Sequence, residues 1–287
     1  MEFNMELERT RETGNTKKKM RVKVLVNDLA DLIELGQKLR AMQRVIFKSR
    51  YGNLLELLEV QVQVHVITAL VQYYDHPLRC FTFCDFQLVP NFEEYAQILD
   101  MPIDKVIPYQ HLDQPISMPT LAAIMRLPAR DLEDRFVWED QKGFSLSFLT
   151  EYLHQLGEER DWEVFMDVFA LALFGIMLFP KTQRFVDNAA ISAYIAYRTQ
   201  SESPVTAILA DTYLALNLCN PKKKTRMACC LPALFVWIVS RFEERVVGIK
   251  CPVESVKQQR LEVKSKDEWS QYMASLTQGK IEWQPAW

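Results

Sequence analysis

The sequence predicts a mainly α-helical fold: a single multi-helix globular domain with one short β-hairpin or strand pair near residues 79–90. Three observations predict this class. Glycine is scarce, at 8 of 287 residues, against a usual share of roughly 7%, which leaves few residues for positive-φ turns and phosphate-binding loops. Hydrophobic residues make up 49% and charged residues 25% of the chain, so disordered, collagen-like and low-complexity classes are excluded. Apolar residues recur at helical intervals over most of the sequence.

The N-terminal region divides into a tail and a helical segment. Residues 1–24 are charged, lack apolar periodicity and contain a Gly-Asn pair, so we expect a disordered tail, with the domain spanning 25–287. Helical spacing then begins and is interrupted at Gly52 and its neighbours, which predicts two helices joined by a short turn. Gly52 is the only glycine that we expect to be required by its position.

The segment 79–89 (RCFTFCDFQLV) is rich in Phe and Thr and partly alternates in polarity, which predicts the short strand or hairpin. Asn91 stands three residues before Glu94, and this capping-box spacing predicts the start of a helix that ends near Leu99. A further short helix is expected over 121–127, where the next proline stops it.

The C-terminal half has the densest helical pattern. A long helix is expected to begin at Asp161, and apolar residues on both of its faces predict that it is central and buried on all sides. Asp187 is the expected cap of the next helix, and Ser203 followed by Pro204 the expected start of another. A last long helix is expected after the loop 220–226.

Charge and cysteine usage exclude several classes of function. The 34 Lys and Arg against 37 Asp and Glu give a net charge of -3, so no global basic field is available to hold a polyanion. The most apolar window, 168–179, is shorter than the roughly 20 residues that span a bilayer, so we expect no membrane partner. The 6 cysteines follow no secreted-scaffold spacing and the N-terminus has no apolar signal region, which predicts free thiols in a reducing intracellular compartment.

Two cysteine groups have both a functional and a packing interpretation. His76, Cys80 and Cys84 stand four residues apart and are zinc-type ligands if a later cysteine joins them. On a strand, however, the two cysteines lie about 13 Å apart, too far to share one ion, so we expect them to be small buried apolar residues. The adjacent Cys229 and Cys230 have no recognisable histidine partner for nucleophilic catalysis, so core packing is expected there too.

Four carboxylates have the residue types of a nuclease or transposase metal site: Asp85, Asp187, Asp211 and Glu243. Such chemistry is normally mounted on a strand-rich sheet, whereas Asp187 and Asp211 fall at or inside predicted helices, so caps and solvated faces are the expected roles. The common phosphate, dinucleotide, zinc-protease and hydrolase motifs are absent from the sequence. We therefore predict no catalytic residue, no metal site, no cofactor and no enzymatic activity.

Two basic runs are the candidate binding residues. One lies in the tail, at 17–19 with Arg21 and Lys23, and the other lies in the loop at Lys222, Lys223, Lys224 and Arg226. Either has the composition of a nuclear-import signal or of a phosphate-contacting patch. Aromatic residues that stack on bases are not interleaved with them, and solvated loop charge is the alternative interpretation of both.

Several stretches taken together resemble the plant mobile domain family. They are YGNLL (51–55), YYDHPLRCFTFCDFQLVPNFEEYAQILDMPI (73–103), FALALFGIMLFP (169–180), LADTYLAL (209–216), CCLPALFVWIVSRF (229–242) and the closing IEWQPAW. More narrowly, the chain resembles the legume branch of uncharacterised-domain proteins allied to the aminotransferase-like plant mobile domain. Similar members have a Gly-Gly pair and Thr-Ile before the double cysteine, where this chain is basic. They also continue beyond the final tryptophan, so we expect a C-terminal truncation.

The resemblance implies a non-enzymatic, transposon-derived interaction domain that acts in the nucleus, in transposon silencing or genome maintenance. It also implies protein partners, phosphatase-like proteins among them. A nucleic-acid-binding module that uses the basic loop 222–226 is the alternative, and a metal-dependent enzyme is a distant one. No lysine sits in a recognisable pyridoxal-phosphate setting, so the aminotransferase-like label implies no activity here.

Overall fold

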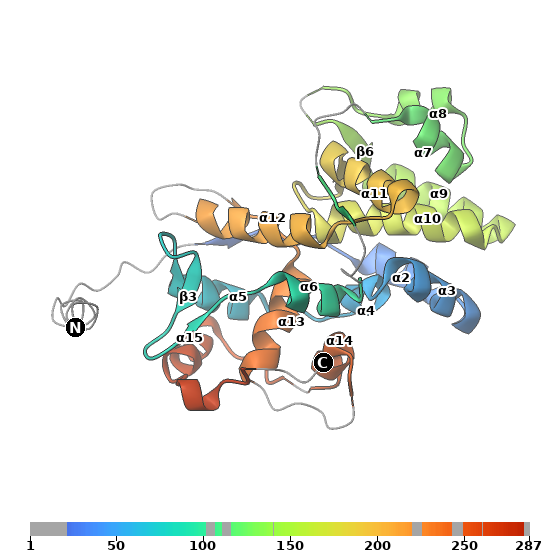
Figure 1. The fold of residues 1–287 in the computed structure, drawn as a ribbon. Helices are drawn as coiled ribbons and strands as arrows, with labels where there is room; N and C mark the ends of the chain where they lie inside the picture. Colours follow the sequence, from blue (N-terminus) through green and yellow to red (C-terminus); the bar gives the residue numbers. More distant parts are fainter. Residues whose placement is uncertain are drawn as a thin grey trace.

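The helix α10 (Trp162–Leu173) and the π-helical turn η2 (Phe174–Leu178) that continues it form the centre of the fold (Figure 1). The computed structural model describes residues 22–101, 107–110, 116–139, 141–219, 226–242, 249–259 and 261–283. Every residue from Val164 to Leu178 is buried. The central helix that the sequence predicts, apolar on both faces, is confirmed.

One layer of helices packs around α10 and occupies the upper part of Figure 1. Its neighbours are α7 (Met118–Met125), α9 (Leu146–Glu159) and α11 (Asn188–Gln200), and α8 (Ala129–Arg135) packs on α7. The strands β6 (Gly143–Ser145) and β7 (Phe185–Asp187) pair antiparallel beside η2.

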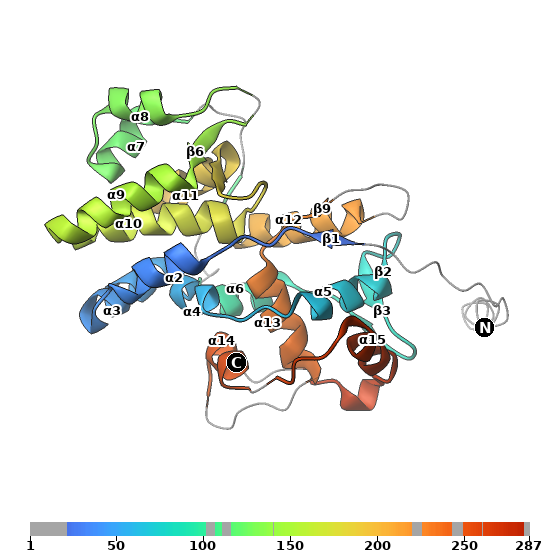
Figure 2. The same cartoon turned by 180° about the vertical axis from the view of Figure 1, so that it is seen from behind.

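The second layer is built around α13 (Leu231–Phe242), in the lower part of Figure 1. This helix contacts α4 (Leu54–Leu58), α5 (Val64–Leu70), α6 (Phe92–Leu99) and α14 (Pro252–Gln258). Two more helices cover this group: α15 (Lys266–Ala274) packs on α5, and α12 (Val205–Leu218) packs on α6. Two helices join the layers, as Figure 2 shows from behind: α2 (Ala30–Gln37) contacts α4 and α9, and α3 (Ala41–Tyr51) contacts α4 and α10.

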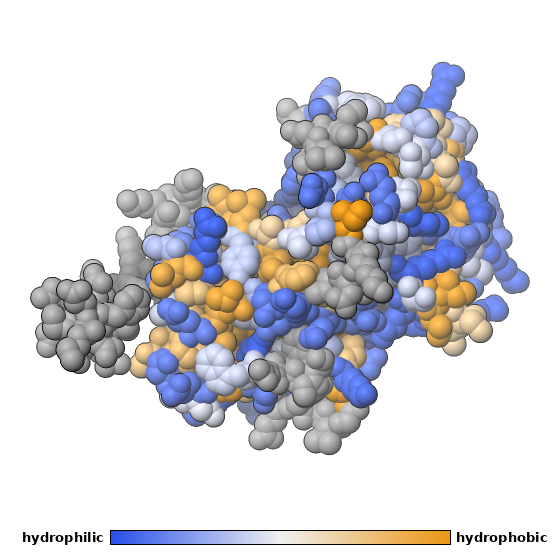
Figure 3. Space-filling model, viewed as in Figure 1, coloured by the Kyte–Doolittle hydropathy of each residue, from blue (hydrophilic) through white to orange (hydrophobic). Residues whose placement is uncertain are grey.

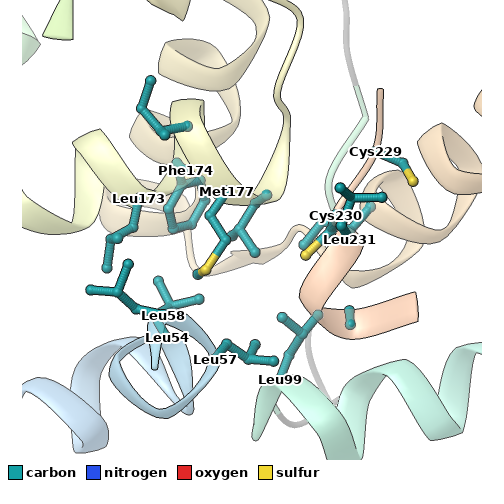
Figure 4. Close-up of a cluster of buried hydrophobic side chains, with 14 of the residues drawn as sticks. Leu54, Leu57, Leu58, Leu99, Leu173, Phe174, Met177, Cys229, Cys230 and Leu231 are labelled. Atoms are coloured by element: carbon teal, nitrogen blue, oxygen red, sulfur yellow. The ribbon is translucent and has the colours of Figure 1, made fainter. Parts of the chain in front are cut away.

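The core between the layers is made of side chains from four segments. Figure 4 shows α4, the end of α6, the α10–η2 junction and the start of α13 converging there. The labelled buried residues are Leu54, Leu57, Leu58, Leu99, Leu173, Phe174, Met177, Cys229, Cys230 and Leu231. Both adjacent cysteines are fully buried, which confirms the predicted packing role.

The mainly α-helical class is confirmed, but the described residues contain four small sheets instead of the one strand pair predicted near 79–90. The predicted hairpin exists as an antiparallel sheet of β2 (Tyr74–Asp75), β3 (Cys80–Thr82) and β4 (Gln87–Leu88). The other pairs are parallel β1 (Lys23–Val24) with β9 (Arg226–Met227), parallel β5 (Ile107–Pro108) with β8 (Glu202–Ser203), and β6 with β7. Strands this short are set by long-range pairing and leave no alternating pattern in the sequence.

The fold begins before the predicted boundary at Leu25. Lys23 and Val24 pair with β9, and the Leu25 N–H donates to the Met227 carbonyl oxygen at 2.8 Å. Residues 1–21 of the predicted tail lie outside the described part of the chain.

Most of the predicted helix starts are confirmed by their caps. The Glu94 N–H donates to Asn91 Oδ1 at 2.9 Å, and the Asn91 N–H donates to a Glu94 carboxylate oxygen at 3.0 Å. Asp161 and Asp187 likewise accept N–H groups of the first turns of α10 and α11.

The start of α12 is shifted by one residue from the prediction. Pro204 takes the cap position that was expected for Ser203, and the helix begins at Val205. Ser203 lies in β8, where pairing with β5 keeps its backbone extended. A proline at the cap is compatible with this start because no N–H is needed there.

The region expected to hold two helices contains four. The segment before Gly52 is divided into α2 and α3, and the segment after it into α4 and α5. The first break is a capping arrangement, in which the Arg40 N–H donates to Gln43 Oε1 at 2.7 Å. Apolar spacing alone does not reveal a break between two helices when the apolar residues on both sides of the break face the same core.

Four helices end on non-glycine residues in the left-handed conformation. These are Asp100, Arg126, Arg160 and Ser201, with φ between 51° and 61°. The expectation that scarce glycine means few positive-φ turns is therefore wrong. Left-handed backbone costs a residue with a Cβ roughly 1–2 kcal/mol, a cost that the packed helices sustain.

Among the glycines that the structure describes, three are required by close packing, where the sequence suggested one. Gly52 is confirmed, with φ +61° and its Cα facing the Leu99 and Asp100 carbonyls. Gly143 and Gly175 were missed. A Cβ on Gly143 would lie 2.1 Å from the Val186 carbonyl oxygen, and one on Gly175 would lie 2.5 Å from a Val186 side-chain carbon.

We predict that Gly52→Ala destabilises the protein by at least about 3 kcal/mol, combining left-handed strain with a forced backbone shift. The added Cβ would lie 2.2 Å from the Leu99 carbonyl oxygen. The measurement is the free energy of unfolding in a denaturant titration. Gly279→Ala is the matched control, because its Cβ meets nothing within 4 Å, and it should change stability by less than about 0.5 kcal/mol. Equal stability of the two variants would contradict the role of Gly52.

Candidate functional site

A buried carboxylate on the central helix is the most distinctive polar group in the described chain. Asp167 lies among apolar residues of α10 and is 5% exposed. The Tyr51 hydroxyl donates to its Oδ1 at 2.5 Å. Arg198, in the last turn of α11, donates from Nη2 to Oδ2 at 3.2 Å and from Nε to Oδ1 at 3.4 Å. The bond pattern ties α3, α10 and α11 together at one point.

A pocket of about 410 Å³ opens next to this carboxylate. We call it the arginine pocket, and its lining residues are Arg50, Tyr51, Met101, Tyr197, Arg198, Ser201 and Ser203. They come from the end of α3, the residues after α6, the end of α11 and β8. The Tyr197 hydroxyl donates to the Arg50 carbonyl oxygen at 2.6 Å, which fixes one wall of the pocket to the other.

Arg50 is the least satisfied cation of this site. Its Nη1 lies 3.9 Å from Asp167 Oδ1 and its Nη2 lies 3.9 Å from Glu163 Oε1. Nη1 is buried and has no hydrogen-bond partner among the described residues. Glu163 is already paired with Arg126 at 2.7 Å. The pocket thus contains two guanidinium groups against a single buried carboxylate.

The phenols around the carboxylate stay protonated. Burial, followed by the charge of Asp167, raises the pKa of Tyr51 far above its usual range. Burial also raises the pKa of Tyr194 well above that of a free tyrosine, and it raises the pKa of Tyr197 to about 12. At neutral pH these hydroxyls are therefore hydrogen-bond donors and not bases.

Sequence reasoning missed this site. Asp167 lies inside the helix predicted to be apolar on both faces, and the arginines belong to other helices, α3 and α11. One signal was available: a carboxylate at the centre of an otherwise apolar run must be paired when the helix is buried all round. That signal predicts a cationic partner but not which one.

The predicted basic loop is described only at its end. Lys222, Lys223 and Lys224 lie outside the described residues, whereas Arg226 is exposed in β9. Its partner in the parallel pairing is Lys23 of β1, also exposed. The structure therefore brings together the ends of two basic runs that the sequence presents separately.

The zinc-type residues His76, Cys80 and Cys84 have separate environments. The Nε2 atom of His76 lies 3.0 Å from the Cys219 carbonyl oxygen. Cys80 is buried in β3, as expected, whereas Cys84 is exposed, contrary to the expectation that it would be buried. Within the described ranges no three His, Cys, Asp or Glu side chains gather closely enough to hold a metal ion.

Three more cysteines are thiols in the core. Burial raises the pKa of Cys230 to about 12 and that of Cys219 to about 11. Burial raises the pKa of Cys229 well above its usual range. A nucleophilic cysteine needs its thiolate form, which these environments disfavour.

The four carboxylates considered as metal ligands have separate positions. Asp85 accepts the Gln278 N–H at 3.3 Å, and Asp187 caps α11 and pairs with Lys181 at 3.0 Å. Asp211 lies inside α12, and Glu243 lies outside the described residues. The first two have the capping and surface roles expected of them.

Asp211 is nevertheless unusual, because it is a half-buried carboxylate within a helix. Burial raises its pKa to about 6, Lys181 opposes the shift, and Asp187 adds to it. The group therefore holds its proton more strongly in the folded chain than in the unfolded one.

A second cavity, of about 420 Å³, lies between the layers and is mainly apolar. Among its lining residues are Leu25, Ile33, Leu58, Met177, Cys229 and Leu231. Part of this wall appears in Figure 4. Glu59 also lines it but is held by Arg44 and Lys257, so this carboxylate is already paired with two cations.

Comparison with known proteins gives one match. The model of the family described as Domain of unknown function (DUF7745) matches residues 32–287. The chain belongs to this family. No curated protein and no solved structure matches it. The DUF7745 match includes every element from α3 onward and all residues of the arginine pocket. No helix in the described part of this DUF7745 chain is both long and apolar enough to cross a membrane.

We predict that Asp211→Asn stabilises the protein at pH 7 and changes little at pH 4. The folded-state pKa of Asp211, about 6, lies above the unfolded value of about 3.9. Because the folded chain binds the proton more tightly, stability falls as pH rises from about 4 to about 6. The amide removes this loss, worth up to about 3 kcal/mol.

The measurement is the free energy of unfolding across pH 4 to pH 7. Asp134→Asn, at an exposed position of α8, is the matched control and should keep the wild-type pH dependence. A pH dependence shared by wild type and Asp211→Asn would contradict the assignment.

Proposed function

We propose that this protein is a non-enzymatic, transposon-derived interaction domain that acts through protein partners in the nucleus. Transposon silencing or genome maintenance is the process in which we place it. The resemblance of residues 45–287 to the plant mobile domain family supports this proposal, and so does an apolar surface on α12. Phosphatase-like proteins are the partners that the resemblance suggests.

A group of exposed apolar side chains near α12 is the observation that most directly supports a protein-binding role. Leu78, Val89, Leu214 and Leu218 are 40–61% exposed, and we call them the α12 patch. Figure 3 shows apolar surface over α12 and the neighbouring β2–β4 sheet. Exposed apolar side chains that gather in one area are typical of protein-binding surfaces.

Hydrogen bonds hold the parts of the α12 patch together. The Tyr213 hydroxyl donates to the Pro90 carbonyl oxygen at 2.8 Å, next to Val89. The Tyr74 hydroxyl donates to Asn217 Oδ1 at 3.0 Å, next to Leu218. The patch is therefore presented on rigid elements, which lowers the entropy cost of binding a partner.

We predict that Leu214→Asp removes the partner set recovered by affinity purification from plant nuclei. A charge at a buried interface position costs several kcal/mol, which is enough to lose a transient complex. Val45→Asp is the matched control, because Val45 is 64% exposed on α3, outside the patch, and it should keep the partners. Identical partner lists for Leu214→Asp and wild type would contradict the proposal, as would a purely cytosolic distribution.

A nucleic-acid-binding module remains the second candidate, and one observation favours it. Lys23 and Arg226 are paired on adjacent parallel strands, so the described ends of the two basic runs lie side by side. Their combined charge is larger than either run alone provides. A metal-dependent enzyme is the distant third candidate, weakened by the capping and surface roles of Asp85 and Asp187.

If the second candidate is correct, replacing Lys222, Lys223, Lys224 and Arg226 by Ala flattens the salt dependence of duplex-DNA binding. Each lost phosphate contact reduces the slope of log K against log salt by about 0.9, so four contacts change it by about 3 to 4. The measurement is a titration at several salt concentrations. Alanine at the exposed Arg130, Lys142, Lys250 and Lys280 is the charge-matched control. An unchanged slope, or one changed equally by the control, would remove this candidate.

A further inference from the structure

We propose that the arginine pocket binds a phosphate monoester group, presented on a phosphorylated side chain of a protein partner. The inference rests on the proposed function, since it assumes that the domain acts through protein partners. The phosphorylated side chain is the part of such a partner that would enter this pocket.

The first support is the free donor capacity of Arg50. Its two ion pairs are loose, at 3.9 Å each, and its buried Nη1 makes no hydrogen bond within the described chain. A buried guanidinium nitrogen without an acceptor is costly. An anion in the pocket would supply the acceptor that the protein itself does not.

The second support is the charge balance. Asp167 is engaged side-on by Arg198 through Nε and Nη2, and Glu163 is engaged by Arg126. Arg50 is thus the cation whose charge is not matched by a close carboxylate. The Nη1 group of Arg198 is also outside the Asp167 pair, so the guanidinium of Arg50 and this one nitrogen of Arg198 remain to share one ligand.

The third support is the remainder of the lining. Ser201 and Ser203 add hydroxyls next to the arginines, while Met101 and the Tyr197 ring add apolar surface. The volume of about 410 Å³ lies within the usual range for small-molecule sites. The pocket therefore has donors for the anion and a wall for the organic group that bears it.

The number of donors favours phosphate over a carboxylate. A carboxylate has two oxygens and one charge, whereas a phosphate monoester has three terminal oxygens and a charge of about −1.5 to −2 at neutral pH. The Arg50 guanidinium, the Nη1 group of Arg198 and the hydroxyls of Ser201 and Ser203 match the larger set. Arginine clusters are the usual means by which proteins recognise phosphorylated side chains.

The pocket is also preorganised. Tyr51 and Arg198 are fixed on Asp167, and Tyr197 is fixed on the backbone of Arg50. Only the Arg50 side chain has to change its conformation to contact the ligand, so little conformational entropy is lost on binding.

The test is a calorimetric titration of the full chain with O-phospho-L-tyrosine, L-tyrosine, inorganic phosphate and acetate. We expect saturable binding of phosphotyrosine, weaker binding of inorganic phosphate, and none of tyrosine or acetate. Equal affinity for phosphate and phosphotyrosine would overturn the assignment to a phosphorylated side chain. Binding of acetate as tight as that of phosphate, or no binding of either phosphate probe, would overturn the phosphate assignment.

Three variants locate the site. Arg50→Gln should weaken phosphotyrosine binding at least about tenfold, the effect of losing charged hydrogen bonds, and Arg50→Lys should fall between this variant and wild type because it keeps the charge without the fork. Arg130→Gln is the matched control, since Arg130 is exposed on α8 and does not line the pocket, and it should bind as wild type does. Circular dichroism melting checks that each variant is folded. Equal binding by Arg50→Gln and wild type would overturn the proposal.

The phosphate titrations and the partner purification separately test the arginine pocket and the proposed interaction domain. If no phosphate probe binds while the nuclear partners still depend on Leu214, the arginine pocket is overturned and the interaction domain stands. If phosphotyrosine binds and depends on Arg50 while no nuclear partner is recovered, the pocket stands without the proposed function.

Discussion

The fold depends on the neutralisation of one carboxylate in its central helix. Asp167 lies on α10, which is surrounded by apolar side chains, and an unpaired charge there would cost several kcal/mol. Arg198 and Tyr51 remove that cost. Because these residues are on α11 and α3, satisfying the charge also fixes the positions of two helices against α10. Packing alone would allow small sliding motions that the directional bonds exclude.

A second buried ion pair has the same role in the other layer. Arg241 of α13 is 4% exposed and pairs with Glu94 of α6, and the Trp237 indole donates to the same carboxylate at 2.9 Å. Arg241 also donates to the carbonyl oxygens of Glu282 and Trp283 at 3.0 and 2.8 Å. Glu94 is at once a capping-box residue and the anchor of α13. The Arg241 guanidinium thereby connects the C-terminal segment to α6 and α13.

The sequence was informative wherever structure is determined locally. The caps at Asn91, Asp161 and Asp187 and the buried character of α10 were all predictable, because each depends on residues within a few positions of one another. The division of α2 from α3 was less visible, since apolar spacing continues through it.

What was missed depends on contacts between distant segments. The β1–β9 and β5–β8 pairs, the contact of Gly143 with Val186 and the arginine pocket all join residues far apart in the chain. Scarce glycine was misleading for a related reason. Several helices end on a residue with left-handed backbone, and in this chain those residues are Asp100, Arg126, Arg160 and Ser201. Tertiary packing outweighs the conformational free-energy cost of that backbone at these residues. Of the candidate site, only the need for a partner to Asp167 was implicit in the sequence.

The position of Val186 between two glycines has a consequence for how this family can vary. Its carbonyl oxygen faces Gly143 and its side chain faces Gly175, with no room for a methyl group on either side. A larger residue at 175 is tolerable only if the residue at 186 becomes smaller, so the two positions are energetically coupled. Family members should therefore show correlated residue sizes at these two places, which belong to two different elements, η2 and β7.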